Sequence, residues 1–207
     1  HSYSLLKQIS TLAAGIQYMN NDLHRRQLGK GTTGMDYDLT LAEPGWGRDL
    51  HFKTSNIALF VENRWQLFRG FSLNTGARVE SGKSDLTGTI TYYPSNEIPT
   101  TIEHKFPLFG VSAEYVLNDN MNFYSGWSQA YGPVIFKDII PASIYEVVDE
   151  DLEDAQGYNF EAGFRGQWNF LKWDATAFHL RYNNRLGTIA ETDGNNNLII
   201  HKSNIGD

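Results

Sequence analysis

The sequence predicts an all-β protein, built as an antiparallel up-and-down meander of about eight long strands. Apolar and polar residues alternate with a period of two in several segments, whereas helical periodicity is weak. Short connections alternate with long ones along the chain. Aromatic residues make up 14% of the 207 residues and glycine accounts for 19 of them, a composition typical of β proteins.

The clearest strand is Tyr158–Phe170. Its even-numbered positions are mainly aromatic, and the positions between them are mainly polar or charged. Successive side chains of a strand point to opposite faces, so this segment has one aromatic face and one polar face. Phe71–Glu80 shows the same alternation. Both segments therefore predict strands that separate two different environments.

The other strands alternate more weakly. In Trp173–Leu186 we place Thr176, Phe178 and Leu180 on the apolar face, with His179 and Arg181 opposite. The eighth strand follows the loop that ends at Asn197. The first seven strands are centred on residues 12–18, 57–65, 71–80, 109–117, 121–131, 158–170 and 173–186.

The connections predict how the strands are arranged. Three short turns lie at Phe68–Gly70, Asn118–Asn120 and Asn169–Leu171. An antiparallel meander places all short turns at one end and all long loops at the other, which is the arrangement of outer-membrane barrels. The long connections are Asn20–Asp49, Gly82–Glu103, Gly132–Ala155 and Thr188–Asn197.

Composition excludes several classes of protein. The net charge of −7 and the lack of a basic block argue against nucleic-acid binding. The chain has no cysteine, so it has neither disulfides nor thiolate sites. No apolar run approaches the length of a transmembrane helix. We find no metal-ligand, nucleophile or phosphate-loop motif, so the sequence predicts no enzyme and no cofactor.

Several segments resemble TonB-dependent outer-membrane receptors in their order and spacing over about 150 residues. Phe71–Glu80 ends in Gly-x-Arg-x-Glu, and Asn122–Pro133 rises into a Ser-Gln-aromatic-Pro loop. Gly34–Asp38 and Gly47–Leu50 are similar to the branch that contains ferric-citrate receptors. The other matching segments are Thr54–Asn63, Tyr158–Arg165, Thr176–Asn184 and Ser203–Asp207.

The resemblance implies that residues 1–207 are part of a transmembrane barrel of about 22 strands around a plug. Eight strands are about a third of such a barrel, and we expect the plug and its TonB-contact segment to be absent from this chain. It implies an outer-membrane receptor that takes up a ferric chelate, citrate-like or another siderophore, with energy supplied through TonB. The expected partners are the chelate, TonB, outer-membrane lipid and lipopolysaccharide.

A basic group in the first predicted loop is the candidate ligand site. It comprises Arg25, Arg26 and Arg48, with His51 nearby. Arginine can hold a carboxylate through two hydrogen bonds, as an anionic chelate requires. Lipopolysaccharide phosphates could bind the same residues, and a solvated loop without a ligand is the alternative.

Polar strand faces and two other clusters complete the candidate residues. The acidic run from Glu146 to Asp154 could bind calcium, but its spacing favours a solvated loop. Trp65, Trp168 and Trp173 lie near short turns and predict an aromatic girdle. Residues expected to line the lumen, or to pair across strands there, are Arg78, Glu80, Glu161, Arg165 and Arg181.

Two other functions remain open from the sequence alone. One is a passive porin-type barrel without a plug. The other is a soluble β-sandwich that binds glycans, in which the aromatic faces would meet in a core. The direction in which Tyr158, Phe160, Phe164 and Trp168 point separates a sandwich from a barrel.

Overall fold

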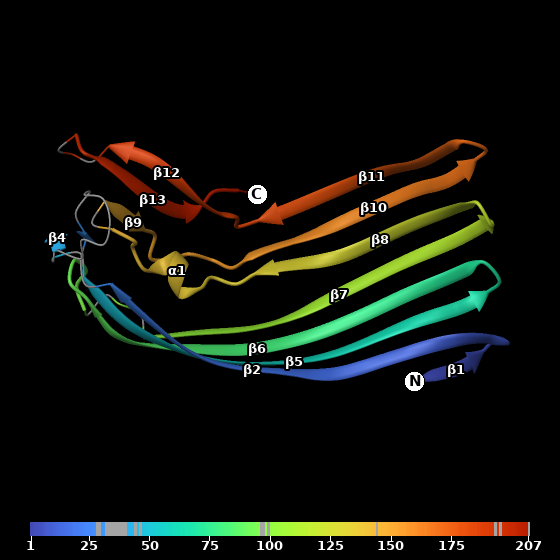
Figure 1. Cartoon of the computed structure of the whole chain (residues 1–207), viewed down its shortest axis with the longest axis horizontal. Coiled ribbons are helices and arrows are strands. Elements are labelled where there is room, and N and C mark those ends of the chain that lie inside the picture. Colours follow the sequence, from blue (N-terminus) through green and yellow to red (C-terminus); the bar gives the residue numbers. More distant parts are fainter. Residues whose placement is uncertain are drawn as a thin grey trace.

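The computed structural model describes residues 1–27, 30–31, 41–43, 45, 47–95, 98, 100–143, 145–192, 194 and 196–206. Apart from one short helix, α1 (Phe136–Ile139), the regular elements of this part of the chain are strands (Figure 1). The all-β prediction is therefore confirmed. The segment Gly34–Asp38, which carried part of the family resemblance, lies outside the described residues.

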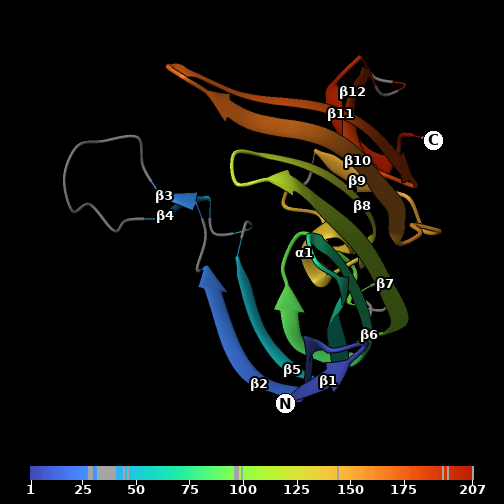
Figure 2. The ribbon, with the colours of Figure 1, turned by 90° about the vertical axis from the view of Figure 1, so that its right-hand side faces the viewer.

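The main sheet has eight strands in the order β1-β2-β5-β6-β7-β8-β10-β11. Every neighbouring pair is antiparallel. The sheet curves around α1 (Figure 2). Its strands are β1 (Ser2–Leu5), β2 (Gln8–Gln27), β5 (Arg48–Phe68), β6 (Phe71–Ile90), β7 (Thr101–Asn118), β8 (Met121–Gly132), β10 (Ala155–Trp168) and β11 (Leu171–Asn183).

Two smaller sheets are formed from the long connections. The three-stranded sheet β12-β13-β9 consists of β12 (Leu186–Thr192), β13 (Leu198–Asn204) and β9 (Glu146–Val148), with β9 parallel to β13. The pair β3 (Lys30–Gly31) and β4 (Leu41–Glu43) makes a two-stranded sheet. The predicted eighth strand is thus β13, which lies outside the main sheet. The main sheet still has eight strands, because β1 pairs with β2 at its edge.

The predicted asymmetry of the connections is confirmed. The two-residue turns after β5, β7 and β10 all lie at one end of the main sheet, together with the turn after β1 (Figure 1). Gly70 has φ +86° and Asn169 has φ +54°, values that these residue types tolerate well in tight turns. We call this end the short-turn end and the other the long-connection end.

Several strands are longer than the sequence indicates. β2 continues to Gln27 and β5 begins at Arg48, so both ends of the predicted loop Asn20–Asp49 belong to strands. In the same way β6 reaches Ile90 and β7 begins at Thr101, which shortens the predicted loop Gly82–Glu103. Both faces carry polar residues here, so the apolar and polar alternation is lost from the sequence. The backbone pairing between the strands nevertheless continues.

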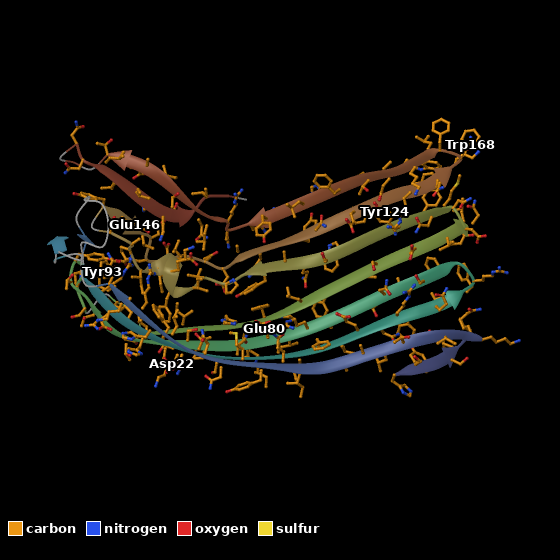
Figure 3. The ribbon with its side chains drawn as sticks, in the orientation of Figure 1. Asp22, Glu80, Tyr93, Tyr124, Glu146 and Trp168 are labelled. Carbon is orange, nitrogen blue, oxygen red and sulfur yellow. The ribbon has the colours of Figure 1, made fainter. Side chains whose placement is uncertain are left out.

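The two faces of the main sheet differ in what they carry. We call the face that carries α1 the inner face and the opposite one the outer face. In Figure 3, Glu80 points to the inner side and Asp22 to the outer side. Directly paired residues of antiparallel strands share a face, so the register assigns the other positions. The outer face carries large exposed apolar residues, including Ile57, Leu59 and Phe160, the last 45% exposed.

The buried core is small and lies on the inner face at the long-connection end. Phe136 of α1 packs there against the strand residues Leu50, Leu86 and Ile90. The aromatic face of β10 takes no part in it, and Trp168 is 73% exposed. The predicted alternative of a β-sandwich requires that face to be buried against a second sheet, so the exposed aromatic face argues against it.

Candidate functional site

The middle of the inner face carries an ion pair between Arg78 and Glu80. Arg78 donates to Glu80 from Nε at 2.8 Å, and its Nη2 lies 2.7 Å from the same carboxylate. Arg78 also donates to Gln17 at 3.0 Å, and Asn56 donates to Glu80 at 2.6 Å. Both predicted lumen residues are therefore held in a network that crosses several strands.

A second network lies nearer the short-turn end, around Arg165. Its Nε donates to Asn122 at 2.9 Å, and its Nη2 lies 3.3 Å from Glu114. The guanidinium carbon is 4.8 Å from the ring centre of Tyr124, which donates to Asp174 at 2.7 Å. Figure 3 labels Tyr124 in this region of the sheet. The polar side chains of four adjacent strands are thus linked across the inner face.

Glu161 is also an inner-face residue. It is paired in register with Gly126 of β8, and it lines a hollow of about 620 Å³ together with Glu62 and Arg64 of β5. The inner face is therefore charged along much of its length, and the lumen-lining role of these residues stays a prediction.

The predicted position of Arg181 is wrong. The register pairs Tyr158 with Arg181 and Glu161 with Phe178. Arg181 therefore shares the outer face with Tyr158, and Phe178 lies on the inner face. The sequence of β11 has polar residues at both phases, so its alternation does not fix which face is which. Pairing with β10 does fix it.

The four predicted ligand-binding residues lie on strands, not in a loop, and they divide between the two faces. Arg25 is paired with Leu50, and Gln27 with Arg48, so Arg25 and Arg48 are on the inner face. Arg26 is paired with Asp49 and belongs to the outer face, as does His51. The prediction of a single basic group is therefore corrected to an inner pair and an outer pair.

The inner pair lines a cavity of about 560 Å³ between α1 and the wall of the sheet. Arg48 is positioned by Gln27, which accepts from its Nε at 3.0 Å and its Nη2 at 2.8 Å. Within the described residues, Arg25 has no carboxylate partner. Other elements add His104, Lys137 and Lys202 to the lining of the cavity. The apolar part of the lining includes Leu23, Leu50, Phe52, Ile102, Phe136 and Ile140.

Sequence reasoning missed the contributions of Lys137 and Lys202. They are 65 residues apart and come from α1 and β13, whose approach depends on long-range packing. Lys202 donates to the backbone carbonyl of Lys137 at 3.2 Å and forms an ion pair with Glu146. Sequence spacing contains no signal for this meeting, because Lys137 lies in the expected loop Gly132–Ala155 and Lys202 in the expected eighth strand, and nothing local relates the two.

The acidic run is tied into hydrogen bonds and ion pairs. Asp154 accepts from the backbone of Val134 at 2.7 Å and from the hydroxyl of Tyr131. Asp149 contacts His201 at 2.7 Å, and Glu146 pairs with Lys202. These carboxylates thus hold the long connections together, which neither the solvated-loop prediction nor the calcium alternative anticipates.

Aromatic rings form a row on the outer face next to the short-turn end. Phe68 stacks on Phe71 with ring centres 5.0 Å apart, and Phe123 stacks on Phe164 at 4.4 Å. Trp173 extends the row, 5.8 Å from Phe164. Trp65 is instead hydrogen-bonded to Thr75 and packed edge-on against Tyr3. The row is the arrangement expected of an aromatic girdle.

No helix in the described part of the chain is long and apolar enough to cross a membrane.

Comparison with known proteins identifies the family. The family model for the TonB-dependent receptor-like β-barrel matches residues 3–207 of the sequence. The structure resembles the ferric-catecholate import receptor Fiu of Escherichia coli K12, with a TM-score of 0.69 and 14% identity over 96% of this chain. It also resembles the ferric citrate transporter FecA, with a TM-score of 0.68 and 20% identity over 89% of this chain.

A third similar structure is the copper transporter OprC, with a TM-score of 0.71, 14% identity and 95% of this chain covered. The chain spans only between a quarter and a third of these structures, namely 31% of Fiu, 30% of OprC and 26% of FecA. At these identities the solved structures establish the shared fold, and the family model establishes membership. The chain therefore belongs to the TonB-dependent receptor β-barrel family, whose members are outer-membrane transporters and not enzymes.

Proposed function

We propose that the protein of which this chain is a part takes up an anionic ferric chelate, citrate-like in chemistry, across the outer membrane. The observation that supports this substrate is the inner-face cavity, which brings Arg25, Arg48, Lys137 and Lys202 to its lining in a chain of net charge −7. Because the chain as a whole repels anions, capture depends on this local positive group.

The two arginines are the residues best suited to hold the chelate. A guanidinium can donate two parallel hydrogen bonds to one carboxylate of the ligand. Arg48 is already oriented by Gln27, and Arg25 on the neighbouring strand lines the same cavity. Lys202 contributes less, because Glu146 neutralises its charge. The apolar lining around Phe52 and Phe136 lowers the local dielectric and strengthens these contacts.

We propose that residues 1–207 supply barrel wall, lumen lining and part of the capture surface. The plug that blocks the lumen, and the segment that contacts TonB, belong in this proposal to the rest of the protein. TonB then rearranges the plug so that the captured ligand passes. A passive porin needs no such cavity at the rim, and the family match favours the receptor over it.

The outer face suits a lipid environment on the same proposal. Between the exposed apolar residues and the long-connection end, the outer face carries a charged band that includes Lys53, Lys83 and Lys105. We place this band at the level of the lipid headgroups, where its lysines can meet lipopolysaccharide phosphates.

The test is a titration of the full-length receptor with ferric citrate. Replacing both Arg25 and Arg48 with alanine should weaken binding at least tenfold, since each charge-assisted hydrogen bond contributes about 1.5–3 kcal/mol. Arg26→Ala is the matched control, because Arg26 adjoins Arg25 in sequence but lies on the outer face. Equal affinity of the double variant and the control would contradict the assigned site.

A further inference from the structure

The tripeptide Asp-Leu-His occurs twice at the long-connection end, as Asp22–His24 on β2 and as Asp49–His51 on β5. The register places His24 directly opposite His51. Because the strands are antiparallel, each histidine then lies diagonally across from the aspartate of the other strand. The two copies are related by a local two-fold axis, and all four side chains project from the outer face.

The four side chains are in close contact. The imidazole rings of His24 and His51 are stacked, with centres 4.0 Å apart and planes inclined by 13°. His24 Nε2 lies 2.6 Å from Asp49 Oδ1, and His51 Nδ1 lies 3.8 Å from Asp22 Oδ1. One ligand atom each from His24, Asp49 and His51 falls within 4.8 Å of the others.

We infer that His24, His51 and Asp49 form a binding site for a divalent transition metal ion such as Zn²⁺ or Ni²⁺ on the outer face of the sheet. Two imidazoles and one carboxylate are a donor set that these borderline ions prefer, whereas Mg²⁺ and Ca²⁺ require oxygen ligands. Bonds of about 2.0–2.2 Å place neighbouring ligand atoms about 3.3 Å apart, so rotations of exposed side chains are enough to close the site.

Asp22 is placed to orient His51 in this site. Its Oδ1 lies 3.8 Å from His51 Nδ1, which is too far for a hydrogen bond, and a rotation of the exposed side chain would bring it to that nitrogen and leave Nε2 for the ion. Metal-bound imidazoles generally donate their other N–H to a carboxylate, which fixes the ring and its tautomer. On the other strand, the hydrogen bond between His24 Nε2 and Asp49 occupies the place of the ion.

Basic side chains also lie beside the cluster. Arg26 approaches Asp49 at 3.5 Å, and Lys53 is paired in register with Asp22 on one side and Asp85 on the other.

The site is separate from the inner-face cavity. Leu23 and Leu50, the central residues of the two tripeptides, line that cavity from the other side of the same strands. A metal ion on the outer face thus joins β2 to β5 behind the ligand-binding wall, and it needs no part in the uptake route. The inference stands whether or not the proposed substrate is correct.

The experiment is calorimetric titration of the purified full-length receptor with Zn²⁺ at neutral pH. The wild-type protein should bind one more Zn²⁺ ion than the His24→Ala and His51→Ala variants, or bind that ion at least tenfold more tightly. His24→Gln, which keeps a hydrogen-bond donor for Asp49, should lose the ion too. His179→Ala is the control, because His179 is an outer-face histidine paired with Phe160, away from the cluster.

Competition with Mg²⁺ completes the test. A large excess of Mg²⁺ should leave Zn²⁺ binding unchanged. Wild-type stoichiometry and affinity in His51→Ala, or equal displacement by Mg²⁺, would overturn the assignment of a transition-metal site.

Discussion

Arg25 and Arg26 are consecutive on β2, yet Arg25 lines the inner-face cavity and Arg26 lies 3.5 Å from Asp49 on the outer face. Their separation follows from the two-residue period of a strand, which sends neighbouring side chains to opposite faces. A basic cluster in sequence is therefore two different surfaces in space. The same alternation decides which side chains of the strands face lipid, and substitutions on the two faces should therefore differ in their effect on stability.

The outer face of β10 should tolerate apolar residues only. Phe160→Arg should destabilise the full-length protein by about 2–4 kcal/mol, because the arginine would be placed in hydrocarbon near the midplane. Glu161→Gln should cost little, since Glu161 lies on the polar inner face. Unfolding titrations in lipid vesicles provide the measurement, and equal losses for the two variants would contradict the assignment of the faces.

The short-turn end should face the periplasm and the long-connection end the cell exterior. Single cysteines at Asp119 and Glu150 probe the two ends, since this chain has no cysteine of its own. A membrane-impermeant maleimide added to intact cells that carry the full-length receptor should label Glu150→Cys and spare Asp119→Cys. Labelling of Asp119→Cys alone would show that the topology is inverted.

The three-stranded sheet should loosen as the pH rises. His201 on β13 contacts Asp149 at 2.7 Å and Glu191 of β12 at 3.3 Å, and the hydrogen bonds to Asp149 and then Glu191 raise its pKa. A raised pKa means that the protonated form stabilises the fold. This contribution is complete below the ordinary pKa of about 6.5 and is lost as the pH passes the raised value.

Hydrogen exchange followed by mass spectrometry can measure this effect. After correction for the intrinsic rates, protection of the β13 amides should fall across that range in the wild type and stay constant in His201→Gln. The same pH dependence in both proteins would show that another group is responsible.

The sequence predicted the elements whose two faces contrast strongly. β10 could be predicted from the sequence because its apolar positions Phe160, Phe164 and Trp168 alternate with polar positions that include Glu161 and Arg165. Where both phases carry polar residues, as around Arg181, only pairing with the neighbouring strand decides the face.

Other features were outside the reach of local patterns. β1 joins β2 through Leu6 and Lys7, which both adopt positive φ without the glycine or asparagine that usually signals such a turn. The cavity depends on α1 and β13 meeting the sheet, so Lys137 and Lys202 could not be assigned to it from spacing. Faces were predictable on strands whose alternation is strong, whereas sites assembled from distant segments were not.

The central proposal is energy-coupled uptake of a ferric chelate, and accumulation of radiolabelled ferric citrate tests it most directly. Iron-starved cells that express the full-length receptor should accumulate the label when TonB is present and stop when TonB is deleted. The Arg25→Ala/Arg48→Ala variant should accumulate much less than Arg26→Ala in the TonB-containing cells. Equal accumulation with and without TonB would indicate a passive pore and contradict the proposal.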